Sequence, residues 1–156
     1  MGRTQGTLIA LGLLLVVALG TYGVTRSAGP SFIDPADQTL VMQGKAIYAV
    51  NCAACHGESL QGQPDWRRRL PDGRLPAPPH DKSGHTWHHP DMMLIDMVKN
   101  GLVPGRTAPP GYVSDMPAYG DMLSDEDIVA VLAYIKSSWP PEVLAAQKEI
   151  TLQRRD

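Results

Sequence analysis

Residues 52–56 read CAACH, two cysteines three positions apart with a histidine directly after the second. On a helical turn Cys52 and Cys55 lie on one face, and His56 lies close to both. Cys-x-x-Cys-His is the spacing at which two thiols bond to one haem as thioethers while the imidazole binds the iron. The motif therefore predicts one covalent haem c, attached through Cys52 and Cys55, with His56 as the first axial ligand.

Two other uses of a Cys-x-x-Cys pair fit the sequence less well. A thioredoxin-like redox pair is expected at a strand-to-helix turn of a βαβ unit, and no such pattern surrounds residues 40–65. A structural zinc site needs a second pair of ligands, but the sequence contains no cysteine beyond these two. Haem attachment is therefore the favoured interpretation.

The first 26 residues predict a membrane-spanning segment. Residues 4–25 carry no charge and follow Arg3, and about 20 apolar residues suffice to cross a hydrocarbon core of about 30 Å. A cleaved signal peptide is the alternative, with a small-x-small site at residues 18–20. Tyr22 at the expected interface favours retention. We expect residues 1–26 to form a single-pass anchor in the inner (cytoplasmic) membrane, with the rest in the periplasm or otherwise outside the cell.

The remaining sequence divides into a linker, one domain and a tail. Residues 27–36 are rich in turn-forming residues and predict a short linker. Residues 37–140 predict a single all-α domain, because no strand-like alternation occurs there. Residues 141–156 predict a peripheral tail with at most a short amphipathic helix.

The predicted helices have recognisable start and stop signals, and they run from residue 37 into the cysteine motif, from 91 to 100, and from 124 to 139. Gly101 is a C-terminal stop signal, while Ser124 and Asp127 stand at capping-box positions. Gly44 inside the first helix costs about 1 kcal/mol relative to alanine. Its presence predicts that another helix crosses closely at this point. The segments between the helices predict two long loops.

The second axial ligand is predicted to be Met116. It lies in a predicted loop, and Pro117 after it favours an extended backbone at position 116. The 60 positions between His56 and Met116 give the chain room to wrap the haem. Met122 is the second choice, whereas the methionines of residues 91–100 fit core packing better.

These residues resemble class I c-type cytochromes, specifically small bacterial ones with an amino-terminal membrane anchor. The matching segments occur in the right order: Gly44 and Tyr48 before CAACH, MPAY at 116–119, and LAYIK at 132–136. The resemblance implies a cytochrome c fold, three to four helices around one covalent haem, with a crossing of the first and last helices near Gly44, Tyr48 and Tyr134. It also implies His56 and Met116 as axial ligands.

Electron transfer follows from this resemblance, because a six-coordinate iron has no vacant site for a substrate. We expect an electron carrier, not an enzyme, that serves redox partner proteins such as a membrane oxidoreductase or a terminal oxidase. The alternatives are a haem enzyme or gas sensor with a dissociable sixth ligand, and a metal-delivery or assembly subunit. The net charge of −2 on an exported chain argues against nucleic-acid binding.

The stretch from His80 to His89 is unusually rich in histidine. The structural interpretation is that Trp87 and one or two of these histidines contact the haem edge or its propionates. The alternatives are a copper site, a pH-dependent partner surface, and His88 or His89 in place of Met116 as the axial ligand.

Charged residues are unevenly distributed along the chain. Four arginines cluster in the first predicted loop, at positions 67, 68, 69 and 74, and five acidic residues occur between positions 115 and 127. The run of three arginines is a solvated loop by default. As a hypothesis, it steers docking to an acidic patch on a redox partner or contacts the haem propionates.

Overall fold

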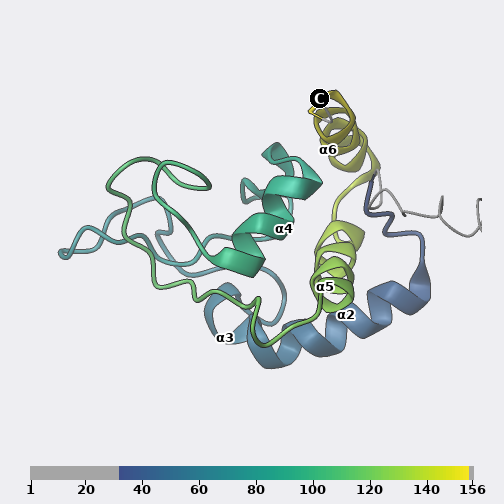
Figure 1. The fold of residues 1–156 in the computed structure, drawn as a ribbon, viewed down its shortest axis with the longest axis horizontal. Helices are drawn as coiled ribbons and strands as arrows, with labels where there is room; N and C mark the ends of the chain where they lie inside the picture. The colour runs from purple at the N-terminus through teal and green to yellow at the C-terminus, as the bar shows by residue number, and fades with distance from the viewer. Residues whose placement is uncertain (1–31, 155–156) are drawn as a thin grey trace, which may run out of the picture. The chain divides into compact units, whose positions relative to one another are not determined.

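The structure, a computed structural model, describes residues 32–154. The helices of this part are α2 (Gln38–Asn51), α3 (Ala53–His56), the short 3-10 helix η1 (Thr86–His88), α4 (Asp91–Asn100), α5 (Asp125–Ser137) and α6 (Pro141–Gln153) (Figure 1). Residues 32–154 contain no β-strand, which confirms the all-α prediction.

The predicted membrane anchor at residues 1–26 and the first half of the predicted linker, residues 27–31, lie outside the described residues. None of the helices within 32–154 combines the length and the hydropathy needed to cross a bilayer.

The predicted signals at the helix ends are confirmed. The Ser124 hydroxyl accepts a hydrogen bond from the Asp127 N–H at 3.1 Å, and the Asp127 carboxylate accepts one from the Ser124 N–H at 3.3 Å, which completes the capping box of α5. Gly101 ends α4 with a φ of 73°, in the left-handed region that glycine adopts readily. Helix α2 starts after Asp37, whose carboxylate caps it.

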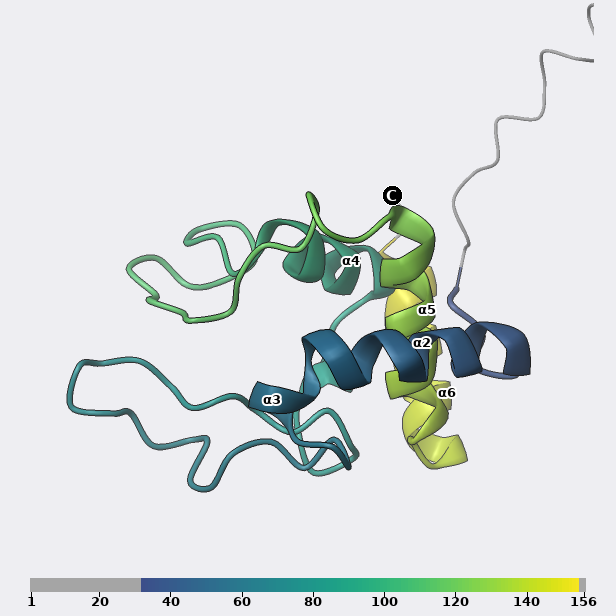
Figure 2. The same cartoon turned by 90° about the horizontal axis from the view of Figure 1, so that it is seen from below.

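Helices α2 and α5 cross at very short range (Figure 2). A Cβ atom placed on Gly44 would lie 1.9 Å from the carbonyl oxygen of Ala130, so only glycine allows the two backbones to approach this closely. One turn further along α2, the ring of Tyr48 packs 5.3 Å from that of Tyr134. The predicted crossing near Gly44, Tyr48 and Tyr134 is confirmed, and it fixes the end of α2 that leads into the cysteine motif.

Two long connections extend to the same side of the helices (Figures 1 and 2). The first loop, residues 57–85, follows α3, and the second loop, residues 101–124, joins α4 to α5. The second loop contacts the first through the carboxylate of Asp115, which pairs with the guanidinium of Arg74. Two residues predicted to belong to separate charge clusters therefore meet in the fold.

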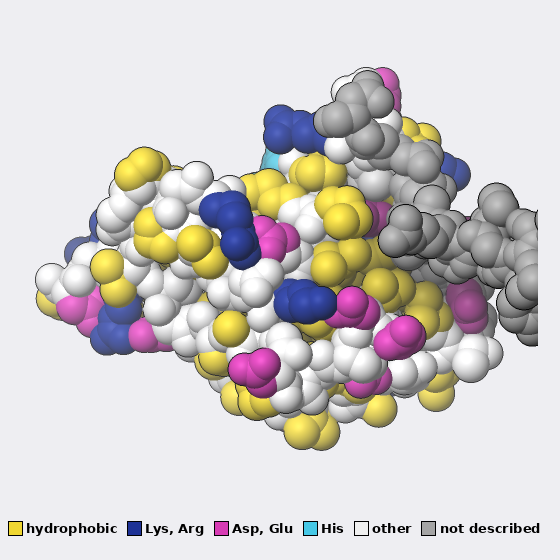
Figure 3. All heavy atoms as spheres, viewed as in Figure 1, with side chains coloured by type: hydrophobic (Ala, Val, Ile, Leu, Met, Phe, Trp, Pro, Cys, Tyr) yellow, Lys and Arg dark blue, Asp and Glu magenta, His cyan; other side chains and the backbone are white. Residues whose placement is uncertain are grey.

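Other charged side chains of the first loop also have local partners. Arg74 forms a second ion pair with Asp72, at 2.5 Å. The guanidinium of Arg67 lies 4.1 Å above the ring of Trp66, and that of Arg69 lies 5.9 Å above the ring of Tyr112. Basic and acidic side chains consequently lie next to each other at the loop end of the face in Figure 3, rather than in one large patch of a single sign.

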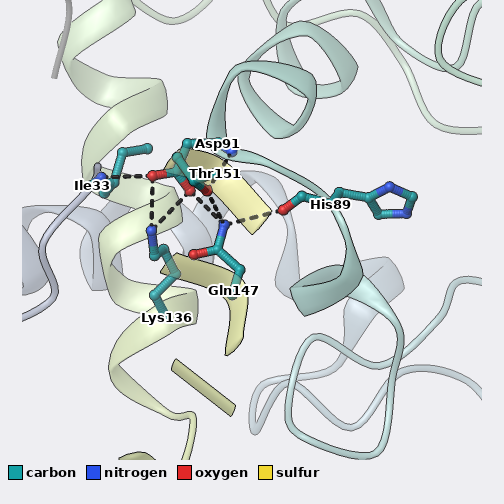
Figure 4. Close-up of polar contacts among 6 residues, drawn as sticks. All are labelled: Ile33, His89, Asp91, Lys136, Gln147 and Thr151. Carbon is teal, nitrogen blue, oxygen red and sulfur yellow. Dashed lines mark hydrogen bonds and ion pairs between the residues drawn. The ribbon is translucent and has the colours of Figure 1, made fainter. Parts of the chain in front are cut away.

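A buried ion pair connects α4, α5 and α6 (Figure 4). The Nζ of Lys136 donates to both carboxylate oxygens of Asp91, at 2.8 and 2.9 Å, and the two side chains are 0% and 2% exposed. The same carboxylate accepts hydrogen bonds from the N–H of Ile33 at 2.6 Å and from the Nε2 of Gln147 at 2.7 Å. The hydroxyl of Thr151 accepts the N–H of Asp91 at 3.1 Å.

Residues 141–156 were predicted to be a peripheral tail, and the packing of α6 corrects this prediction. Gln147 and Thr151 are buried in contact with Asp91, so the helix is held to the domain along one side. These contacts are made by polar side chains, which a search for an apolar stripe does not detect.

Lys136→Met is expected to lower the free energy of unfolding by about 3 kcal/mol, because it leaves a buried carboxylate without its cationic partner. Burial lowers the pKa of Lys136 to about 8 while Asp91 opposes the shift, so the ammonium is charged at neutral pH. Urea denaturation at pH 7 measures the difference. The matched control is Lys99→Met, which breaks an exposed pair with Asp125 and should cost less than about 1 kcal/mol. Equal losses in the two variants would contradict this interpretation of the buried pair.

Candidate haem-binding site

The CAACH motif lies where α2 meets α3. The N–H of Cys52 donates to the carbonyl of Tyr48 at 2.9 Å, and the carbonyl of Cys52 accepts the N–H of His56 at 2.9 Å, so the motif continues the helical turn. Cys52 is half-buried, Cys55 is exposed, and neither is in a disulfide. Burial, and then the neighbouring Cys55, raise the pKa of the Cys52 thiol to about 11. Both sulfurs are therefore unpaired thiols at the spacing that haem attachment requires.

His56 is buried, with 9% of its surface exposed, and one ring nitrogen is already engaged. Its Nδ1 lies 2.9 Å from the carbonyl oxygen of Pro78. A carbonyl only accepts, so Nδ1 carries the proton and Nε2 keeps its lone pair. Burial lowers the pKa of His56 while the bond to Pro78 opposes the shift, which favours the neutral ring. A neutral imidazole with its other nitrogen bonded to a carbonyl is the usual form of a histidine ligand.

Pro78 is placed by the way the first loop folds back on itself. The backbone N–H of Gln63 donates to the carbonyl of Ala77 at 2.9 Å, and the side-chain oxygen of Gln63 accepts the N–H of Ala77 at 3.0 Å. The two stretches approach closely at Gly62, where a Cβ atom would lie 2.4 Å from the nitrogen of Pro79. The fold of the loop thus presents the Pro78 carbonyl to His56.

Met116 lies on the second loop and is half-buried. Its N–H donates to the hydroxyl of Ser114 at 3.0 Å. Three residues further on, the hydroxyl of Tyr119 donates to the carbonyl of Asn51 at 2.6 Å, directly before the first cysteine of the motif. Burial, followed by the two nearby thiols, raises the pKa of Tyr119. The structure therefore brings the loop that carries Met116 beside the cysteine motif.

The other candidate methionines occupy different surroundings. Met122 is 61% exposed and Met92 is 66% exposed, whereas Met97 packs against the core.

The histidines of the stretch from residue 80 to 89 do not converge on one point. Three of them stack on different aromatic partners: His80 on His56, His85 on Trp66, and His88 on Trp87, with ring centroids 4.0, 5.4 and 3.6 Å apart. Nowhere in residues 32–154 do three or more His, Cys, Asp or Glu side chains come together in a group that could hold a metal ion.

Trp87 supplies a buried donor whose partner is not among residues 32–154. Its indole Nε1 is shielded from solvent and makes no hydrogen bond there. Buried N–H groups in folded proteins are nearly always paired, so an unpaired one fits an acceptor supplied by a bound group. A haem carries two propionate carboxylates, and this donor suits either of them. Together with two free thiols and a neutral imidazole, the residues present fit a covalent haem.

The roles of Pro78 and Tyr119 were not predicted from the sequence. Each residue contacts a residue far away in the chain through a single group. The backbone carbonyl of Pro78 accepts from His56, and the hydroxyl of Tyr119 donates to the carbonyl of Asn51. For Pro78 the available signal was the concentration of prolines at positions 76, 78 and 79, which stiffens the loop without indicating where its carbonyls point. Tyr119 stood out only as the last residue of the matching segment MPAY.

Comparisons with known proteins support this site. The sequence model of the family described as "Cytochrome c" matches residues 41–139. Over 100 residues the chain is 31% identical to a cbb3-type cytochrome c oxidase subunit CcoP of Azospirillum sp. (strain B510), covering 64% of this chain and 29% of that protein. Over 115 residues it is 27% identical to a gluconate 2-dehydrogenase cytochrome c subunit of Pantoea cypripedii, covering 72% of this chain and 24% of that protein.

The chain is also similar to a third protein. Over 72 residues the chain is 33% identical to a cytochrome bc1 complex cytochrome c subunit of Mycobacterium bovis (strain ATCC BAA-935 / AF2122/97), covering 41% of this chain and 26% of that protein. The chain thus spans between 24% and 29% of the lengths of these three relatives. No solved structure gives a significant match.

A helical domain with a Cys-x-x-Cys-His motif on its first helices defines a c-type cytochrome. The family match covers most of this domain, and the chain belongs to the cytochrome c family. Its cofactor is accordingly a covalently bound haem c. The resemblance to class I c-type cytochromes is confirmed.

Proposed function

We propose that this chain is a membrane-tethered, single-haem electron carrier. Cys52 and Cys55 would hold the haem through two thioethers, and His56 and Met116 would be the ligands of its iron. The observation that carries the proposal is the state of His56: a buried, neutral ring whose Nδ1 is bonded to Pro78 and whose Nε2 keeps its lone pair.

Support for Met116 comes from the path of its loop. Tyr119 ties the second loop to the residue before Cys52, so a ligand three residues earlier is close to the motif.

Each group has a defined chemical task. The haem supplies one-electron chemistry, while the chain supplies binding, orientation and electrostatics. The Pro78 carbonyl holds the proton of His56 on Nδ1 and fixes the ring. The thioether of Met116, a softer ligand than a second imidazole, would raise the reduction potential of the bound haem and leave its iron no open position. The indole of Trp87 donates a hydrogen bond to a propionate.

The location and partners are part of the proposal. Residues 1–26 anchor the chain in the inner membrane and place the haem domain in the periplasm or outside. The names of the relatives, subunits of an oxidase, a dehydrogenase and a bc1 complex, support exchange of electrons with a membrane oxidoreductase or terminal oxidase. The tether keeps the carrier near such complexes and raises its effective concentration there.

A potentiometric titration of the purified full chain, combined with metal analysis, tests this function. We expect one reversible wave with the slope of a single-electron couple and one iron per chain, because the sequence contains one CAACH motif. A second redox wave, or a stoichiometric second metal such as copper, would contradict a simple carrier and favour metal delivery through the histidine-rich stretch.

A further inference from the structure

His80 lies directly against the proposed iron ligand. The ring centroids of His80 and His56 are 4.0 Å apart, and the planes of the rings are inclined by only 22°, so the two imidazoles are stacked face to face. An iron bound to Nε2 of His56 would lie in the plane of that ring, whereas His80 lies over its face. His80 is therefore placed to contact the ligand ring and not to be a second ligand itself.

The position of His80 is fixed at the ring and at both backbone groups. Its Nδ1 is 2.8 Å from the hydroxyl of Thr86. Its N–H donates to the carbonyl of Leu60 at 2.8 Å, and its carbonyl accepts the indole N–H of Trp139 at 2.8 Å. The ring of Tyr48 meets that of His80 edge-on, with centroids 6.4 Å apart.

The contacts of His80 reach beyond its own loop. Trp139, which donates to the carbonyl of His80, belongs to the buried core after α5, so the loop position is tied to the helical body of the domain. The other stacked pairs of this stretch, such as His85 on Trp66, do not involve the proposed ligand.

The hydrogen bond to Pro78 and the stacked ring of His80 restrict different motions of the His56 ring. The hydrogen bond from Nδ1 to Pro78 fixes one atom of the ring but allows the plane to tilt about that point. The ring of His80, held by its hydrogen bond to Thr86 and stacked on one face of His56, restricts this tilt. Groups around a metal ligand set the orientation of its ring in this way, and the orientation influences the electronic state of the metal.

We propose that His80 is a positioning residue for His56: its stacked ring fixes the plane in which the His56 imidazole binds the haem iron. This assignment rests on the proposed ligation by His56. The positioning role depends on the flat ring at position 80 and on the Thr86 hydroxyl that holds this ring. It does not depend on a change in the charge of His80.

Electron paramagnetic resonance of the oxidised, haem-loaded full chain tests the assignment, because the g values of low-spin ferric haem report the orientation of the axial ligands. We expect His80→Leu, which removes the flat ring, to shift the largest g value or to split the signal into two populations with haem still attached. His80→Phe keeps a flat ring but loses the hydrogen bond to the Thr86 hydroxyl, so it should retain the wild-type signal as its main component and add a smaller second one. His85→Leu is the matched control and should leave the signal unchanged.

Thr86→Val keeps the His80 ring but removes the hydroxyl that holds it, and should add a second, smaller signal. This variant decides the matter if His80→Leu fails to accumulate as folded protein. A wild-type signal in His80→Leu, or in Thr86→Val when the first variant does not fold, overturns the assignment even if thermal stability falls. A wild-type protein without the low-spin signal of a histidine and methionine pair would instead overturn the proposed function, and the positioning role with it.

Discussion

The double variant Cys52→Ala/Cys55→Ala is expected to carry no covalent haem. Both thioether bonds need a cysteine sulfur, and the sequence contains no other cysteine that could substitute. Removing them should also destabilise the domain, because a haem supplies apolar surface to a chain with only 6% aromatic residues. Haem staining after denaturing electrophoresis, together with the mass of the intact chain, measures the loss.

The single variants are the matched controls for this experiment. Cys52→Ala and Cys55→Ala each leave one thiol, so each is expected to retain haem through a single bond, in reduced yield. Comparable haem staining in the double variant and the wild type would overturn the account of the site as a whole, including the roles given to His56 and Met116.

Met116→Ala is expected to leave the haem attached but to change the coordination and the reduction potential of its iron. Loss of the thioether removes the soft sixth ligand, so the reduction potential should fall and the charge-transfer band from the methionine sulfur to ferric iron should disappear. Optical spectroscopy of the oxidised protein and a potentiometric titration detect both changes.

Met122→Ala is the control for Met116→Ala, because Met122 lies on the same loop with 61% of its surface exposed. It should keep both the band and the potential of the wild type. If Met122→Ala loses the band and Met116→Ala keeps it, Met122 is the ligand. If the wild-type protein itself lacks the band, a histidine such as His88 or His89 becomes the candidate.

The helical frame could be predicted from the sequence because its signals are local. The capping residues Ser124 and Asp127, and the stop at Gly101, act within one helical turn and mark the ends of α4 and α5. Gly44 is informative for a different reason. A glycine inside a helix is costly, so its presence indicated a close crossing, and the carbonyl of Ala130 occupies the space a side chain would need.

The buried polar contacts of α6 could not be predicted because they form between groups that meet only in the folded chain. Asp91 and Lys136 are 45 positions apart, and Gln147, which donates to Asp91, has no distinctive local pattern. Charged residues are normally solvated, so neither member of the pair signals burial by itself.

Part of the candidate site was predictable and part was not. The CAACH spacing indicates haem attachment because the chemistry demands those residue types at that spacing. For the histidine-rich stretch, by contrast, the sequence allowed several roles, and it contained nothing that distinguished among them. The fold distinguishes among its members: His80 stacks on His56, whereas His88 stacks on Trp87. His80 and His88 are neighbours in the sequence, but their rings contact different parts of the fold.

Carbon monoxide binding to the reduced, full-length protein tests the central claim most directly, because this ligand binds ferrous haem only where a coordination position is open. If His56 and Met116 fill both axial positions of an electron carrier, the optical spectrum of the reduced wild-type protein should not change under carbon monoxide, while that of Met116→Ala should. A wild-type protein that binds carbon monoxide readily would contradict the account and favour a haem enzyme or gas sensor.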